Sequence, residues 1–167
     1  MTGFRLDKGG LIERSQKINF RFNGQQVTGF KGDTIASALM ASGHMLVGRS
    51  FKYHRPRGIM SAGVEEGGAL FNTGDGAARV PNVKGTVTEI SDGLRVYSQN
   101  VFPSPGFDLG AVNGLIAPFI TAGFYYKTFM GPFANTKFWM LCERFIRRAA
   151  GLGQASREAD PSTYDIA

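Results

Sequence analysis

A tightly turned β-hairpin is the feature that most constrains the fold of this 167-residue chain. Lys17 to Phe22 alternates polar and apolar residues, which is the pattern of a half-buried strand. Asn23–Gly24 follows, and both residues tolerate the positive φ that a two-residue hairpin turn requires. Gln25 to Phe30 is then the returning strand, so we expect Phe20 to pair with Val27 across the hairpin.

A short helix is predicted directly after the hairpin. Asp33 or Thr34 can cap its free backbone amides, and Gly43 is suited to end it. The helix has only about ten residues, so packing against the hairpin must stabilise it. Its inner face is expected to comprise Ile35, Ala38, Leu39 and Ser42.

Further strands are expected over 69–72, 80–90 and 94–98, with a turn at 73–76. A hairpin, a helix and then several strands indicate a small α+β roll within residues 1–100, preceded by an irregular arm at 1–15.

Residues 101–151 form a second part, rich in aromatic residues. Asn135 to Gly151 is predicted to be an amphipathic helix. One face of this helix carries Phe138, Leu141, Cys142, Phe145 and Ala149. Residues 152–167 are polar and unpatterned, so a linker or tail is expected there.

Composition narrows the cellular setting. A single cysteine excludes a disulfide within the chain, and the first fifteen residues lack the apolar core of a signal peptide. The uncharged run 109–126 is interrupted by glycine and proline, which makes a poor membrane-spanning helix. The sequence therefore indicates a cytoplasmic protein that does not enter the membrane.

Gly48 to Gly58 alternates aromatic and basic residues. With the net charge of +6, this basic segment can contact an acidic partner or a cofactor phosphate, or stack on nucleic acid. It can equally be a strand and turn whose arginines pair with local carboxylates and carbonyls. These interpretations stay open at this point. The candidate contact residues are Arg49, Lys52, His54, Arg55 and Arg57.

No grouping of residues in the sequence predicts a catalytic or metal site. Neither His44 nor His54 stands in a cluster with ligand spacing, so both are expected to be structural. Glu65–Glu66 can form an acid–base pair only if they lie in a loop, because neighbours on a strand point to opposite faces.

The string G-R-S-F-K-Y-H-R-P-R-G-I, from Gly48 to Ile59, resembles the N-terminal domain of the α subunit of heterotetrameric sarcosine oxidase. Supporting strings are G-D-T-I-A-S-A-L at 32–39, A-G-F-Y-Y-K-T-F at 122–129 and I-R-R-A-A-G-L-G at 146–153. The resemblance implies an α+β fold of the β-grasp, 2Fe-2S ferredoxin-like type, followed by an aromatic-rich helical extension.

Ferredoxins of this type bind their cluster through cysteines spaced C-x4-C-x2-C, with a fourth cysteine later. The resemblance places these four positions at Ser61, Glu66, Ala69 and Thr86. None of these residues can supply a thiolate, and Cys142 is distant in sequence. The expectation is therefore a ferredoxin-like domain without a cluster or other metal, which disfavours an electron carrier.

The resemblance also implies a parent flavoenzyme complex, an oxidoreductase that converts sarcosine to glycine with formation of hydrogen peroxide and methylenetetrahydrofolate. That complex would use FAD, FMN, NAD and tetrahydrofolate, none of them in this chain. This chain would be a non-catalytic structural domain in contact with the other subunits and the rest of the α subunit. Alternatives are a subunit of an N-methylglutamate dehydrogenase type of enzyme and a basic module that binds anions or nucleic acid.

Overall fold

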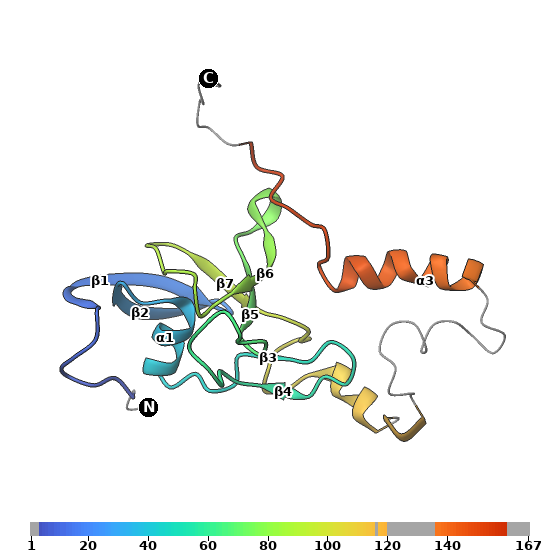
Figure 1. Cartoon of the computed structure of the whole chain (residues 1–167), viewed down its shortest axis with the longest axis horizontal. Helices are drawn as coiled ribbons and strands as arrows, with labels where there is room; N and C mark the ends of the chain where they lie inside the picture. The colour runs from blue at the N-terminus through green and yellow to red at the C-terminus, as the bar shows by residue number, and fades with distance from the viewer. Residues whose placement is uncertain (1–3, 116, 120–135, 160–167) are drawn as a thin grey trace.

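The fold is centred on a five-stranded mixed sheet with the order β2-β1-β7-β5-β6 (Figure 1). The computed structural model describes residues 4–115, 117–119 and 136–159. The central β1–β7 pair is parallel and joins the N-terminal hairpin to the antiparallel strands that follow. These strands are β1 (Glu13–Phe22), β2 (Gln25–Lys31), β5 (Leu70–Thr73), β6 (Val80–Lys84) and β7 (Arg95–Ser98).

The predicted hairpin is confirmed, with Phe20 opposite Val27. Its turn has φ of 48° at Asn23 and 84° at Gly24, which is the left-handed conformation that this residue pair tolerates. The prediction of an irregular arm over 1–15 is wrong at its end, because β1 already begins at Glu13. A register shift between Glu13 and Lys17 interrupts the pairing of β1 with β2. The polar–apolar alternation therefore does not extend to the first residues of the strand, and the sequence did not predict them.

The predicted helix is α1 (Ile35–Ala41). Thr34 is its N-cap and forms a reciprocal capping box with Ser37, while Gly43, at φ 84°, follows its last turn. The helix packs its apolar face onto the sheet and completes the core. The core residues from these elements are Phe20, Phe22, Val27, Ile35, Ala38, Leu39, Phe71 and Val96.

The strand predicted over 80–90 is too long, because β6 ends at Lys84. Beyond that residue the chain turns towards α1. The carbonyl of Gly85 accepts the amide of Ala36 at 2.8 Å, and the carbonyl of Thr88 accepts the amide of Ile35 at 2.9 Å. This segment thus satisfies the free amides at the start of the helix instead of extending the sheet.

The basic segment forms a small second sheet, in which β3 (Gly48–Arg49) pairs with β4 (Pro56–Arg57). After β7, the described chain contains short 3-10 turns and a long helix at the side of the molecule opposite the β1–β2 hairpin (Figure 1). These elements are η2 (Leu109–Gly114), η3 (Ala117–Phe119) and α3 (Thr136–Ala149), while η1 (Gly76–Ala78) lies between β5 and β6.

The amphipathic helix predicted over 135–151 corresponds to α3. Phe138, Leu141 and Phe145, on the predicted apolar face, are exposed, whereas Glu143 and Ile146 are buried. Parts of the predicted aromatic run and of the predicted tail, 120–135 and 160–167, lie outside the described residues. Within the described ranges, no helix is long and apolar enough to cross a bilayer.

The N-terminal segment is fastened to the domain by an ion pair. Arg5 donates to both carboxylate oxygens of Asp33, at 3.2 and 2.6 Å. Asp33 is only 1% exposed and also accepts from the amide of Phe30 and the hydroxyl of Ser37. The pair therefore ties residues before β1 to the β2–α1 turn.

We predict that Arg5→Ala lowers the free energy of unfolding by about 2 kcal/mol, because it removes charge-assisted hydrogen bonds from a buried carboxylate. Urea denaturation measures the change. Lys17→Ala, at an exposed position of β1, is the control and should change stability by less than about 0.5 kcal/mol. Equal effects of the two substitutions would show that the ion pair does not hold the N-terminal segment.

Candidate functional site

The glycine-rich loop at 58–70 is organised around the carboxylate of Glu66. Oε2 accepts the backbone amides of Met60 and Ser61, both at 2.6 Å, and Oε1 accepts the amide of Gly68 at 2.5 Å. The hydroxyl of Ser61 adds a longer contact of 3.4 Å. Glu66 is 4% exposed, so its charge is satisfied by the loop's own backbone rather than by water.

These contacts control the ionisation of Glu66. Burial by itself would raise the pKa of the carboxyl group, but the amides of Gly68, Ser61 and Met60 outweigh burial and hold the pKa below its ordinary value. Glu65 is exposed, and its pKa is also lowered, chiefly by a backbone hydrogen bond. Both carboxyl groups are therefore ionised at neutral pH, and neither is tuned to act as a general acid.

The close packing of the loop explains why position 68 is a glycine. A Cβ atom on Gly68 would lie 2.6 Å from the carbonyl oxygen of Gly58 and 2.9 Å from Oε1 of Glu66. Only a residue without a side chain allows the backbone to approach the carboxylate so closely.

The other positions that the resemblance assigned to cluster ligands lie around this same loop. Ser61 is hydrogen-bonded to Glu66, as described above. Thr86 reaches across from the end of β6, and its Oγ1 donates to the carbonyl of Gly63 at 2.8 Å. Ala69 is buried beside it, and its carbonyl accepts the amide of Gly85 at 2.9 Å. Folding thus gathers Ser61, Glu66, Ala69 and Thr86 into one region.

This set of residues does not fit a 2Fe-2S cluster. Ligation needs thiolates, or histidine in some centres, and these four positions offer a hydroxyl, a carboxylate, a methyl group and a second hydroxyl. The one cysteine of the chain, Cys142, lies on α3. In the described part of the chain, no group of three or more His, Cys, Asp and Glu residues could hold a metal ion.

Another buried carboxylate, that of Asp108, anchors the basic segment. Its Oδ2 lies 2.7 Å from Nδ1 of His54 and 3.6 Å from Nε of Arg49. Arg49 also donates to the carbonyls of His54 and Pro105, at 2.7 and 2.9 Å. Arg49 thus pairs within the chain, as the strand-and-turn interpretation expected, but its carboxylate partner comes from a distant segment rather than from the basic segment itself.

Asp108 also organises the segment that follows β7. Its Oδ1 accepts the amides of Phe102 and Gly110, at 2.9 and 3.3 Å. Burial would raise the pKa of the carboxyl group, but the amide of Phe102 and the hydrogen bond with His54 prevail and lower it. Asp108 therefore stays charged and joins 48–57 to 102–110.

Of the remaining basic candidates, Arg55 and Arg57 are accessible to partners, whereas Lys52 is half-buried. The guanidinium of Arg55 and the ammonium of Lys52 each lie 5.0 Å from the centre of the Tyr53 ring. Arg55 and Arg57 are exposed. The structure thus divides the five candidates into an internal pair, Arg49 and His54, an exposed pair, Arg55 and Arg57, and the half-buried Lys52.

Sequence reasoning did not identify Asp108 as an organising residue, and no local signal marks it, because its contact with His54 spans 54 residues. It placed Glu66 in the right loop only through the resemblance. The role of its carboxylate as the acceptor for that loop was not predicted.

Comparison with known proteins agrees with this architecture. Residues 15–101, just over half of the chain, match the model of the 2Fe-2S iron-sulfur cluster binding domain. The chain belongs to this family. The matched region runs from β1 to just beyond β7 and contains the Glu66 loop, so the ferredoxin-like domain is the part of the chain described above as the sheet and α1.

The chain is also homologous to the α subunit of sarcosine oxidase. It is 54% identical over 166 residues to that subunit from Rhizobium meliloti (strain 1021). The aligned region covers 99% of this chain and 16% of the relative. The subunit from Corynebacterium sp. (strain U-96) is 40% identical over 89 residues, covering 52% of this chain and 9% of the relative. This chain therefore spans less than a fifth of the length of these relatives.

Among solved structures, L-proline dehydrogenase from P. horikoshii matches 55% of this chain and 17% of its own chain, with a TM-score of 0.43 and 18% identity. This likeness carries no argument about function.

We predict that Glu66→Gln lowers the free energy of unfolding by about 2 kcal/mol at neutral pH, because an uncharged amide cannot accept all the loop donors. Glu65→Gln, at the exposed neighbour, is the matched control and should change stability by less than about 0.5 kcal/mol. Chemical denaturation of both variants measures the difference.

The pH dependence gives a second measure of the same carboxylate. The pKa of Glu66 is lower in the folded chain than the ordinary value of 4.5. Its contribution to the free energy of unfolding is therefore complete above pH 4.5 and is lost as pH falls further. The stability gap between wild type and Glu66→Gln should therefore narrow below pH 4.5. A gap that stays constant down to pH 3 would contradict the proposed role of the charge.

Proposed function

We propose that this chain is a non-catalytic β-grasp domain of a sarcosine oxidase type α subunit, in which an internal carboxylate has taken the place of the iron–sulfur cluster. The observation that carries the proposal is the Glu66 carboxylate, held by three backbone amides of the loop to which the resemblance assigns the cluster ligands. Homology to the α subunit over nearly the whole chain supplies the context.

The carboxylate of Glu66 can replace the negative charge of a cluster. A 2Fe-2S cluster held by four thiolates is an anionic group, and hydrogen bonds to its sulfurs help to set its properties. A loop that surrounds an anion needs inward-pointing donors, and such donors would be costly to leave unpaired. The carboxylate of Glu66 supplies the missing negative charge from within the chain. The loop can then keep its shape without thiolates.

The proposed role is to hold the α subunit together and to shape a surface for the other subunits. Two exposed surfaces support this role. One is the apolar face of α3, with Phe138, Leu141 and Phe145, which is favourable for burial against protein. The other is the exposed pair of the basic segment, Arg55 and Arg57, which suits an acidic partner or a flavin phosphate.

The parent complex, by this proposal, is a cytoplasmic enzyme that oxidatively demethylates sarcosine to glycine and forms hydrogen peroxide and methylenetetrahydrofolate. FAD, FMN, NAD and tetrahydrofolate would be bound by other parts of that complex. Redox chemistry would accordingly lie outside the 167 residues of this chain.

We predict that the chain purifies without stoichiometric iron and without the visible absorption of a 2Fe-2S cluster, even after anaerobic reconstitution with iron and sulfide. Metal analysis and an absorption spectrum measure this outcome. A reconstituted cluster that is stable to gel filtration would establish an electron carrier and refute charge replacement by Glu66.

We predict that Arg55→Ala combined with Arg57→Ala weakens assembly of the complete α subunit with its partner subunits by about tenfold, since both charges are exposed and unlike Arg49 are not paired with Asp108. Co-purification and flavin content of the complex measure the effect. Lys8→Ala combined with Lys17→Ala removes the same charge from other exposed positions and is the control. Unchanged assembly in the arginine variant would exclude the basic segment as a contact surface.

A further inference from the structure

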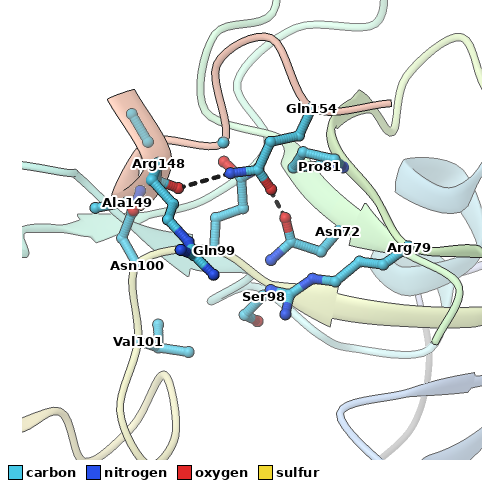
Figure 2. A pocket seen from close by; sticks show the side chains of 12 residues that line it. Asn72, Arg79, Pro81, Ser98, Gln99, Asn100, Val101, Arg148, Ala149 and Gln154 are labelled. Atoms are coloured by element: carbon cyan, nitrogen blue, oxygen red, sulfur yellow. Dashed lines mark hydrogen bonds between the residues drawn. The ribbon is translucent and has the colours of Figure 1, made fainter. Parts of the chain in front are cut away.

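A cavity of about 410 Å³ lies between the outer strands of the sheet and the C-terminal end of α3, away from the Glu66 loop (Figure 2). Its walls are mainly polar. The polar lining side chains include Asn72, Arg79, Gln99, Asn100, Arg148 and Gln154.

Two arginines give the cavity its charge. Arg79 precedes β6 and Arg148 lies in the last turn of α3, and Figure 2 shows their side chains entering the cavity from opposite sides. Of the described residues that line the cavity, none is Asp or Glu. The cavity therefore has a net positive charge.

One carboxylate that could compete for Arg79, Asp75, is already engaged by other side chains. Asp75 is close enough to Arg79 to interact electrostatically with it. However, Asp75 is bound by the guanidinium of Arg95 and by the hydroxyl of Tyr97, the latter at 2.6 Å. It does not line the cavity, so the guanidinium of Arg79 is available to an incoming anion.

The walls that carry the two arginines are held together by hydrogen bonds. Asn82, on β6, donates to the carbonyls of Ala150 and Gly151, at 2.9 and 3.1 Å, and so fixes the end of α3 against the sheet. Gln99 donates to the side chains of Asn72 and Asn82, at 3.2 and 3.0 Å.

The chain beyond α3 closes one side of the same cavity. Gln154 donates to the carbonyl of Arg148 at 2.9 Å, as Figure 2 also shows. Because hydrogen bonds already join these walls, a ligand would lose less free energy to the ordering of side chains when it binds.

We propose that this cavity binds a phosphoryl group of a small ligand, with Arg79 and Arg148 contacting it from opposite sides. Two guanidinium groups match the charge of a phosphate dianion, and each can present paired N–H donors to its oxygens. The side-chain amides on the walls add neutral hydrogen-bonding groups. This site is distinct from the Glu66 loop, and the inference does not depend on the proposed structural role of the domain.

The test is a titration of the 167-residue chain with inorganic phosphate and with pyrophosphate, in which calorimetry and NMR measure binding. We expect saturable binding, with perturbed signals concentrated on the cavity walls. Arg79→Gln and Arg148→Gln should each weaken binding by about tenfold, and Arg144→Gln, an exposed arginine of α3 that does not line the cavity, should leave it unchanged. Thermal melts of all variants establish that each remains folded.

Further probes define the ligand class. Acetate should bind much more weakly than phosphate, because a monocarboxylate offers only one charge to two arginines. ADP that binds more tightly than pyrophosphate would indicate a phosphate carried by a nucleotide, and equal affinities would indicate a small phosphorylated ligand. The proposal is overturned if neither phosphate nor pyrophosphate binds at low salt, if acetate binds as tightly, or if Arg144→Gln weakens binding as much as Arg148→Gln.

Discussion

A carboxylate that is withdrawn from water must be matched by donors, and this requirement organises the irregular parts of the domain. Asp33 receives Arg5 and thereby holds the N-terminal segment on the β2–α1 turn. Glu66 collects the amides of its own loop. Asp108 joins the basic segment to the chain after β7. At these points a buried negative charge determines where a loop lies, while apolar packing holds the sheet and α1.

The Glu66 loop is the place where a buried carboxylate coincides with the expected ligand positions of the family. The fold is that of a domain whose family binds a cluster, and the residues at the expected ligand positions still come together around one loop. These positions offer a carboxylate, two hydroxyl groups and a methyl group, none of which is a thiolate. In our proposal, the loop still surrounds an anion, which is now the carboxylate of Glu66, but the domain can no longer transfer electrons. A domain of this type can then contribute surfaces and stability to a larger enzyme.

Local patterns in the sequence predicted the elements whose signals lie within a few residues. The alternation before Asn23–Gly24, the cap at Thr34 and the amphipathic stretch that becomes α3 all correspond to observed elements. Predictions failed where a distant segment competes for the backbone. The strand expected to reach Ile90 stops at Lys84, because the carbonyls of Gly85 and Thr88 serve the first amides of α1.

The hairpin–helix unit follows from local patterns in the chain, and a single cysteine is too few for a cluster with four cysteine ligands. Tertiary packing, in contrast, determines which groups lie at the centre of the Glu66 loop. It brought Asp108 to His54 across 54 residues and set Arg79 opposite Arg148 on one cavity. The reason is that ligand counts and local periodicity are properties of composition and neighbouring residues. Hydrogen-bond partners of buried charges depend on how remote segments pack.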